Sequence, residues 1–342
     1  MSGDNSNHLP VAHTNASNSS DLGICQLPPT SKNLALSLIL VAICIVTFCG
    51  NLFVCATVYI HCALRSTTNY LIVSLALADL LVSLLSMPFR IHFTLRNNNW
   101  CLRSNVCGLW IWVDFVACSS SIGSLAAVSI DRFVAVKFPL RYRALLTKQT
   151  SLKMICFVWM YSMIFASLGN YNWTFHAFET FTQCHKNDRV FYTTVASLAF
   201  FLPLGIIIGT YSYLTKVAVH QRRRTLTNTV RPEGERPFRR ARILHELKAA
   251  KMMACVVLIF IASWAPFFIL MLSGFWHDRD TTSRLNIPYA VRDIFVLILP
   301  NLNSAINPFM YMAFTRELRE QVAKLVERLF CRSCKCHESR VP

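Results

Sequence analysis

Long runs of apolar residues alternate with short polar segments along this chain. The first run lies between Lys32 and His61 and contains no charged residue. Six more runs follow, each with one acidic residue or none, at residues 69–89, 106–130, 154–173, 190–214, 252–276 and 294–314. Because a helix needs about 20 apolar residues to cross the hydrocarbon core of a bilayer, the pattern predicts an all-α membrane protein built as a seven-helix transmembrane bundle.

Composition and charge agree with this prediction and orient the chain. Hydrophobic residues make up 54% of the sequence and charged residues 15%, whereas soluble domains are about 25% charged. Most of the 34 lysines and arginines fall in segments that are cytoplasmic if the N-terminus is extracellular, as the positive-inside rule requires. We therefore interpret the net charge of +17 as a basic cytoplasmic rim. We expect a multi-pass plasma-membrane protein that contacts membrane lipids and no nucleic acid.

The pattern divides the chain into three parts. Residues 1–33 are expected to form an extracellular leader, 34–314 the transmembrane bundle, and 315–342 an interfacial helix and cytoplasmic tail. Within the bundle, the basic segment 219–244 is expected to be a mobile third cytoplasmic loop. Acceptor motifs for glycosylation fall on the predicted outer side, at Asn15, Asn18 and Asn172.

Four of the 14 cysteines fall on the outer side, where disulfides can form: Cys25, Cys101, Cys107 and Cys184. Four cysteines allow three pairings. We expect a Cys107–Cys184 bond, which would pin the loop before the fifth run over the mouth of the bundle. A Cys25–Cys101 bond would tie the leader to the first outer loop, and free thiols at these two positions are the alternative.

Three further cysteines follow the amphipathic stretch RELREQVAKLVERLF in the tail, at Cys331, Cys334 and Cys336. Cysteines beside an interfacial helix are candidates for palmitoylation, which would make the protein a lipoprotein. A Cys-x-x-Cys-x-Cys metal site is the weaker alternative, because only His337 lies nearby as a further ligand.

Asp114 is a carboxylate inside the third run, and an ionisable group within a membrane span indicates a functional site. At 1.5 Å per residue it lies about 10 Å below Cys107, with Ala117, Cys118 and Ser121 on the same helical face. The apolar runs contain no lysine or arginine in their outer halves, so an unpaired carboxylate would suit a cationic ligand such as a protonated amine. The alternative is a carboxylate hydrogen-bonded only for structure. A lysine or arginine that clasped Asp114 would remove the amine assignment.

Asp79 lies deeper, near the middle of the membrane, among amide and hydroxyl side chains. The other polar residues expected at similar depth are Asn51, Ser121, Asn303, Ser304 and Asn307. Such a group of oxygens without a lysine partner could hold a small cation such as sodium, and a hydrogen-bond network that packs the helices is the alternative. No cofactor is expected to be required.

Charged residues at the inner end of the third run suggest a switch. Asp131 and Arg132 are expected to pair, and Glu246 before the sixth run could also reach Arg132. This arrangement would form a clamp between two helices that can break, with ordinary boundary charges as the alternative.

Prolines interrupt three of the runs. Pro203, Pro266 and Pro308 each remove a backbone hydrogen bond and are expected to kink their helices. Trp264 precedes Pro266, and Phe267 and Phe268 follow it. Bulky aromatic side chains are therefore expected to line a pocket floor beside a hinge.

The motifs at these positions resemble those of the rhodopsin-like (class A) G-protein-coupled receptors. They occur in order over about residues 34–330, as Gly50-Asn51, LALAD ending at Asp79, Cys107, DRF from Asp131, Trp159, Pro203, Tyr211, SWAP around Trp264 and NPFMY from Asn307. Phe133 replaces the usual tyrosine of the third-helix motif, and Ser263 replaces the usual cysteine before the tryptophan. One motif alone would be weak evidence, whereas the ordered set is specific.

The resemblance implies roles for three groups of residues. The packing triad that rearranges on activation matches Ile122, Pro203 and Phe260. The sodium site matches Asp79, Ser121, Asn303 and Asn307. The inner residues that engage a G protein match Arg132, Tyr211 and Tyr311.

Asp114 falls where aminergic receptors hold the ammonium group of the ligand, but neighbouring positions depart from the aminergic pattern. Val195, Ala196 and Ala199 stand where catecholamine receptors carry serines. Asn301 and Ile298 stand where aminergic receptors usually have tyrosine and tryptophan. We therefore expect an amine-like or other cationic ligand that is not a catechol. The expected binding residues are Asp114, Cys118, Val195, Ala199, Trp264, Phe267, Phe268 and Asn301.

The expected function is that of a receptor for an extracellular small molecule that activates a heterotrimeric G protein, with arrestin and a receptor kinase as further partners. The alternative is a class A receptor for a peptide, lipid or other non-amine ligand that does not contact Asp114. A transporter or channel would need polar groups along the full depth of a pathway, and Trp264 and Phe267 are expected to separate the outer polar groups from the middle ones. We expect no enzyme, because the spans contain no combination of nucleophile and base.

Overall fold

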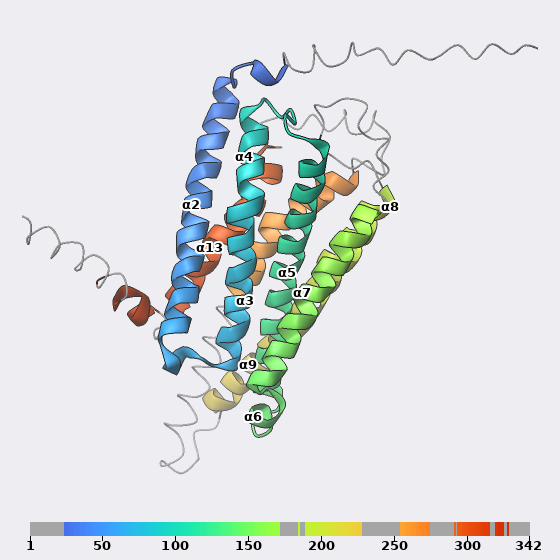
Figure 1. The fold of residues 1–342 in the computed structure, drawn as a ribbon. Coiled ribbons are helices and arrows are strands. Elements are labelled where there is room, and N and C mark those ends of the chain that lie inside the picture. The colour runs from blue at the N-terminus through green and yellow to red at the C-terminus, as the bar shows by residue number, and fades with distance from the viewer. Residues whose placement is uncertain are drawn as a thin grey trace, which may run out of the picture.

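The computed structural model describes residues 24–171, 184, 189–227, 254–273, 291, 293–314, 319–324 and 327. Seven helices within these residues are long and apolar enough to cross a membrane. They lie side by side in one bundle, with the start of α2 and the short helix α6 at opposite ends (Figure 1). The prediction of a seven-helix membrane protein is confirmed.

The first half of the bundle contains four spans. Helix α2 covers Ser31–Ile60, and the 3-10 turn η1 follows at Cys62–Leu64. The second span joins α3 (Thr67–Leu81), a π-helical turn η2 (Val82–Ser86) and α4 (Met87–Leu95). Helix α5 covers Ser104–Lys137, and α6 (Tyr142–Leu145) lies between it and α7 (Lys148–Tyr171).

The second half contains the remaining spans. The fifth joins α8 (Arg189–Val195), the π-helical turn η4 (Ala196–Phe201) and α9 (Leu202–Thr227). The sixth is the helix Ala254–Ser273. The seventh joins the π-helical turn η5 (Ile294–Ile298) to α13 (Leu299–Phe314), and residues 319–324 form a short helix beyond it.

Several helices extend further than the apolar runs predicted, including α5, α4 and α9. Helix α4 continues to Leu95, six residues past the predicted end of the second run at Phe89. Helix α9 continues to Thr227, so the beginning of the segment predicted as a mobile loop from residue 219 is helical. In both places the helix continues beyond the last residue of the apolar run. A residue with a long charged side chain can stay in a helix at the membrane boundary, because its charged end reaches water.

Each π-helical turn precedes a proline, at Pro88, Pro203 and Pro300. A proline ring clashes with the carbonyl of the residue four positions earlier and donates no hydrogen bond, so widening the preceding turn accommodates it. A local change of helix type therefore precedes Pro203, and the predicted kinks stay predictions. The helices continue through Pro266 and Pro308 without such a turn.

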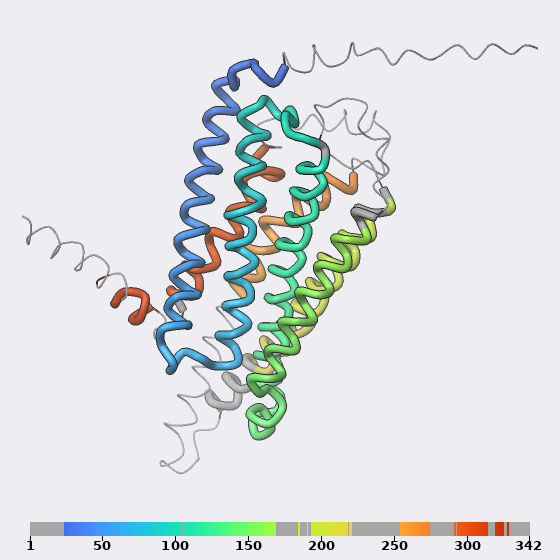
Figure 2. Tube along the Cα trace, viewed as in Figure 1, coloured from blue at the N-terminus to red at the C-terminus, as the bar shows by residue number. Residues whose placement is uncertain are grey.

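Helix α5 is the most central span, and α7 is peripheral. Inside the apolar window of each helix, 72% of residues are buried in α5 but only 17% in α7. The tube view in Figure 2 shows α5 between the α3–α4 span and α7. A site built on α5 can therefore contact most other spans, whereas most of α7 faces lipid.

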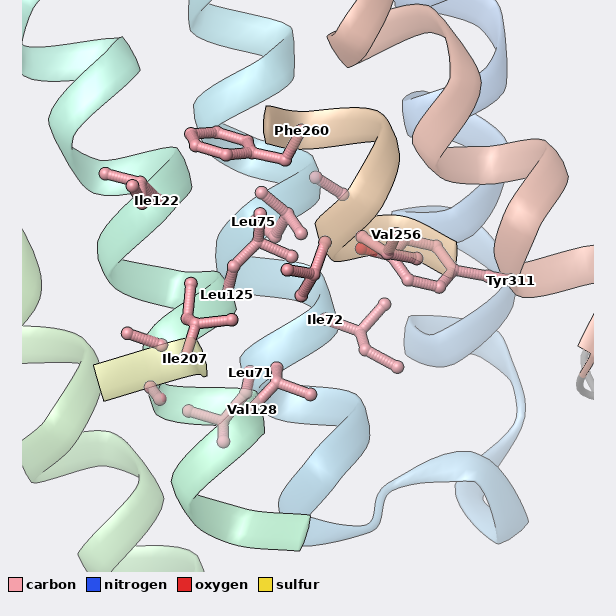
Figure 3. Packing of buried hydrophobic residues seen from close by; sticks show 14 of the residues in the cluster. Leu71, Ile72, Leu75, Ile122, Leu125, Val128, Ile207, Val256, Phe260 and Tyr311 are labelled. Atoms are coloured by element: carbon pink, nitrogen blue, oxygen red, sulfur yellow. The ribbon is translucent and has the colours of Figure 1, made fainter. Parts of the chain in front are cut away.

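The main apolar core lies in the middle and inner parts of the bundle. Side chains of α3, α5, α9, helix 254–273 and α13 meet there (Figure 3). Ile122 and Phe260 are the outermost of the side chains labelled in Figure 3, and Tyr311 of α13 packs beside Val256. The core thus joins the region around Ile122 to the inner end of the bundle.

Candidate functional site

A cavity of about 240 Å³ opens between α4, α5, η4 and helix 254–273 in the outer half of the bundle. Its lining is mostly apolar and aromatic. The lining residues are Arg90, Phe93, Trp110, Ile111, Asp114, Phe115, Cys118, Ser119, Ile122, Cys184, Val195, Ala199, Phe200, Phe260, Trp264, Phe267, Phe268 and Met271. All of the predicted binding residues except Asn301 line this cavity.

Helix periodicity explains which part of α5 faces the cavity. Ile111, Asp114, Phe115, Cys118 and Ile122 recur at intervals of three and four residues, so they share one face of the helix. The sequence placed Ala117, Cys118 and Ser121 on the face of Asp114. Of these, Cys118 lines this cavity, Ser121 lines only the second cavity described below, and Ala117 is buried in a core cluster. The outward continuation of the cavity face could have been found by extending the same spacing toward Cys107.

Asp114 does not stand alone in the cavity, and the expectation of an unpaired carboxylate was wrong. An Arg90 amino nitrogen, Nη2, lies 3.4 Å from Asp114 Oδ2. The Ser86 hydroxyl donates a short hydrogen bond to Asp114 Oδ1. The expectation failed because α4 continues past Phe89. Arg90 therefore lies one turn beyond Ser86 on the same helical face and reaches α5.

Arg90 is also held by an aromatic ring. The centre of its guanidinium group lies 5.1 Å from the centroid of the Trp110 ring, a distance that permits a cation–π contact. Trp110 itself stacks on Trp100 with ring centroids 5.2 Å apart. This stack fixes the guanidinium group above the carboxylate, at the outer rim of the cavity.

The ion pair remains accessible from the cavity. The Arg90 side chain is 20% exposed and the Asp114 side chain 32%. A carboxylate has about four lone-pair sites, and the described residues give Asp114 two hydrogen-bond donors, Ser86 and Arg90. The cavity therefore presents both a positive and a negative group to a ligand.

A second cavity of about 40 Å³ shares Arg90, Asp114, Cys118, Trp264 and Phe267 with the first. It extends toward the middle of the membrane, where its lining includes Ser121, Asn301, Asn303 and Ser304. The predicted binding residue Asn301 lies here, and its side-chain nitrogen donates to the Leu297 carbonyl oxygen at 2.7 Å. Trp264 and Phe267 thus form walls of both cavities.

The predicted deep polar group assembles around Asp79, which is fully buried. Asn307 Nδ2 donates to Asp79 Oδ2 at 2.9 Å, and Asn51 Nδ2 donates to the Ser304 carbonyl oxygen at 3.2 Å. Within this group, four buried oxygens have no hydrogen-bond partner among the described residues: Asn51 Oδ1, Asp79 Oδ1, Ser121 Oγ and Asn303 Oδ1. Carboxylate, hydroxyl and amide oxygens are the ligands that hard cations prefer, so this donor set fits the predicted sodium ion, which stays a prediction.

The residues of the predicted packing triad lie at the junction of cavity and core. Ile122 and Phe260 belong to both the cavity lining and the core cluster. Pro203 lies at the start of α9, next to η4. The Phe200 ring of η4 lies 5.6 Å from Phe260 and 4.2 Å from Phe268 between centroids. A movement of side chains at the cavity floor would therefore change the packing of the core.

At the inner end of α5, Arg132 pairs with Asp131 at 2.5 Å. Asp131 is fully buried, and it accepts hydrogen bonds from Thr68 Oγ1 at 2.7 Å and from the Tyr142 hydroxyl at 3.0 Å. Burial, followed by the nearby Asp131 carboxylate, raises the pKa of Tyr142 above its usual value. Tyr142 therefore stays a neutral donor. Tyr211 and Tyr311 are both buried in the core cluster nearby.

Both expected disulfides are present. Cys25 is bonded to Cys101 and Cys107 to Cys184. Several other predicted residues lie outside the described part of the chain: Asn15, Asn18, Asn172, Glu246, Cys331, Cys334 and Cys336. Their predicted roles in glycosylation, the inner clamp and palmitoylation stay predictions.

Comparison with known proteins agrees with this architecture. The family described as 7 transmembrane receptor (rhodopsin family) matches residues 50–311. The Alpha-1A adrenergic receptor of Oryctolagus cuniculus is 30% identical over 337 residues, which cover 89% of this chain and 71% of the relative. The Homo sapiens receptor of the same name is 30% identical over 339 residues, with the same coverage.

The Histamine H2 receptor of Cavia porcellus is 32% identical over 320 residues, covering 91% of this chain and 83% of the relative. The family match extends over most of the bundle and includes the cavity, the Asp79 group and the Asp131–Arg132 pair. Its members are receptors rather than enzymes. This chain is therefore a multi-pass membrane receptor that belongs to the rhodopsin family, class A, of G-protein-coupled receptors.

Proposed function

We propose that this receptor binds an extracellular small molecule bearing a protonated amine, with the ammonium group at Asp114, and then activates a heterotrimeric G protein. The carrying observation is the Asp114 carboxylate, 32% exposed in a largely apolar and aromatic cavity of about 240 Å³. An anionic group surrounded by aromatic faces suits an ammonium ion, because both attract a cation. The relatives support the proposal, since one is named a histamine receptor and two are named adrenergic receptors.

Arg90 already pairs with the carboxylate that is proposed to bind the ligand's ammonium group. Asp114 is not an unpaired carboxylate, so a ligand cation has to share it with a guanidinium group 3.4 Å away. The Asp114–Arg90 pair meets the condition that removes an amine assignment resting on Asp114 alone. The amine is proposed on two other grounds: the relatives named as histamine and adrenergic receptors, and the lone pairs and side-chain exposure that Asp114 keeps toward the cavity. Arg90 also favours the second candidate, a receptor for a non-amine ligand in which Asp114 serves only to hold Arg90.

Signal transfer would run from the cavity floor through the core. Trp264 and Phe268 line the cavity, and their ring centroids lie 5.9 Å apart. Phe260 lies one turn inward, with its ring centroid 6.3 Å from Trp264. A ligand shifts the receptor only by its differential affinity for two arrangements of these rings. The favoured arrangement would separate the inner ends of the helices and release the Arg132 region for a G protein, with arrestin and a receptor kinase as later partners.

The test is a screen of biogenic amines in transfected cells with a second-messenger readout, comparing wild-type receptor with Asp114→Asn. A matched control is Asp293→Asn, which removes a carboxylate paired with Lys32 at 2.5 Å, outside both cavities. We expect Asp114→Asn to lose the amine response at normal surface expression and Asp293→Asn to keep it. An unchanged response in Asp114→Asn would reject the amine proposal and leave the non-amine receptor.

A further inference from the structure

Arg90 is a cationic group that the amine proposal does not use. Its side chain lines both cavities and is held over the Trp110 ring. A guanidinium group has five N–H donors, and among the described residues Arg90 gives one hydrogen bond, to Asp114. Its position is thus fixed, while most of its donors remain available to a molecule in the cavity.

The charges of the larger cavity balance each other. Arg90 and Asp114 are its two charged residues within the described part of the chain, and the rest of the lining is uncharged. A lone ammonium ion near Asp114 is attracted by the carboxylate and repelled by a guanidinium group only 3.4 Å from it. A lone carboxylate near Arg90 meets the same conflict with opposite sign. For either ligand, repulsion by the nearby like charge therefore offsets part of the electrostatic attraction to the opposite charge.

A ligand that carries both charges avoids this conflict. In an amino acid, one carbon separates the ammonium group from the carboxylate, a spacing that matches two opposite protein charges in direct contact. The ammonium can bond to Asp114 while the carboxylate takes the free guanidinium donors, in the two-pronged geometry that arginine favours. All four charges then have opposite neighbours, and none is buried without compensation.

We propose that the cavity selects small zwitterions, namely amino acids or close analogues with an apolar or aromatic side chain. This inference rests on the proposed function, because it keeps the ammonium group at Asp114. The cavity volume of about 240 Å³ suits one such molecule. The floor formed by Trp264, Phe267 and Phe268 favours an apolar or aromatic side chain over a polar one.

The test uses two series of probes that differ only in their charged groups. The aromatic series is phenethylamine, L-phenylalanine and 3-phenylpropionate, and the aliphatic series is isoamylamine, L-leucine and 4-methylpentanoate. Binding is measured as the rise in melting temperature of the purified full-length receptor, and activation as second-messenger output. We expect the zwitterion of at least one series to act at a concentration tenfold or more below that of its amine or its acid.

Variants assign this preference to Arg90. Arg90→Gln should abolish the preference for the zwitterion. The amine should then act at the same concentration as the zwitterion or at a lower one. Arg90→Lys, which keeps the charge but loses the two-pronged geometry, should retain only part of the preference. Arg96→Gln is the matched control, because Arg96 follows α4 and donates to the Cys25 carbonyl oxygen at 2.7 Å. It should leave the order of the probes unchanged. Melting temperatures without ligand identify a variant that misfolds.

The outcomes separate the two proposals. Amines that act more strongly than their zwitterions on the wild type, and lose their action in Asp114→Asn, would overturn the zwitterion and retain the amine. Acids that act unchanged in Asp114→Asn would overturn both proposals. No response to either series would overturn the zwitterion as stated here, while the wider amine screen with Asp114→Asn would still decide the proposed function.

Discussion

Gly50 of α2 lies where only a glycine allows the present approach to α13. A Cβ atom at this position would lie 2.9 Å from Pro308 Cγ and 3.1 Å from Pro308 Cβ. Atoms in the core do not approach so closely, and the proline ring cannot rotate away because its backbone angle is locked. Substituting Gly50→Ala must therefore push α2 and α13 apart.

Two opposing contributions set the size of the effect. Alanine is favoured over glycine inside a helix by about 1 kcal/mol, whereas overpacking a well-packed core costs about 1 to 3 kcal/mol. Separating the helices also strains the hydrogen bond from Asn51 to the Ser304 carbonyl oxygen, now 3.2 Å long, and a lost buried bond costs about 1 kcal/mol. The steric cost should exceed the gain, so Gly50→Ala should destabilise the receptor by about 1 to 3 kcal/mol.

The assay is thermal unfolding of the purified receptor, with Gly205→Ala as the matched control. Gly205 lies on the exposed face of α9, and no atom would lie within 4 Å of an added Cβ. Gly205→Ala should therefore leave the melting temperature equal to wild type or slightly higher, while Gly50→Ala should lower it. If Gly50→Ala melted at or above the melting temperature of Gly205→Ala, the inference that α2 packs too closely on α13 for a Cβ atom at residue 50 would be refuted.

Three further predictions test other parts of the molecule. Replacing potassium chloride by sodium chloride at equal ionic strength should raise the melting temperature of the wild type but not that of Asp79→Asn. Identical melting temperatures of the wild type in the two salts would contradict the proposed sodium site. Asp131→Asn should raise basal G-protein activation severalfold, because it breaks the 2.5 Å ion pair with Arg132; unchanged basal output at equal expression would contradict this. Cys25→Ser and Cys101→Ser should each lower the melting temperature, and the double variant should equal either one, because all three lose the same bond. Additive losses would mean that the two thiols act independently.

The sequence predicted the scaffold and most of the cavity because both depend on long-range regularities of composition. Runs of apolar residues located the spans. The three- and four-residue spacing after Asp114 placed Cys118 in the cavity, but it also pointed to Ala117, which is buried in a core cluster. Arg90 was missed because a charged residue ends an apolar run without ending the helix. Hydropathy therefore placed it outside the second span.

The π-helical turn η2 shows why the facing of α4 was hard to predict. Such a turn holds about one extra residue, and each residue turns a helix by about 100°. The turn at Val82–Ser86 therefore rotates Arg90 relative to Asp79. No periodic pattern signals that rotation, although Pro88 could have suggested a break. The Asp79 group was easier to predict, because the expected depth of its members was enough to bring them together.

The outer and inner ends of the bundle are fastened by different kinds of bond. At the outer end, disulfides join Cys25 to Cys101 and Cys107 to Cys184, and Lys32 pairs with Asp293. At the inner end, the described contacts around Asp131 are all non-covalent. Covalent bonds thus restrain the outer end of the bundle more than its inner end, so we expect the helices to move less around the cavity than at their cytoplasmic ends. Reducing these disulfides with an extracellular reductant should therefore weaken the coupling between ligand binding at the outer end and G-protein activation at the inner end.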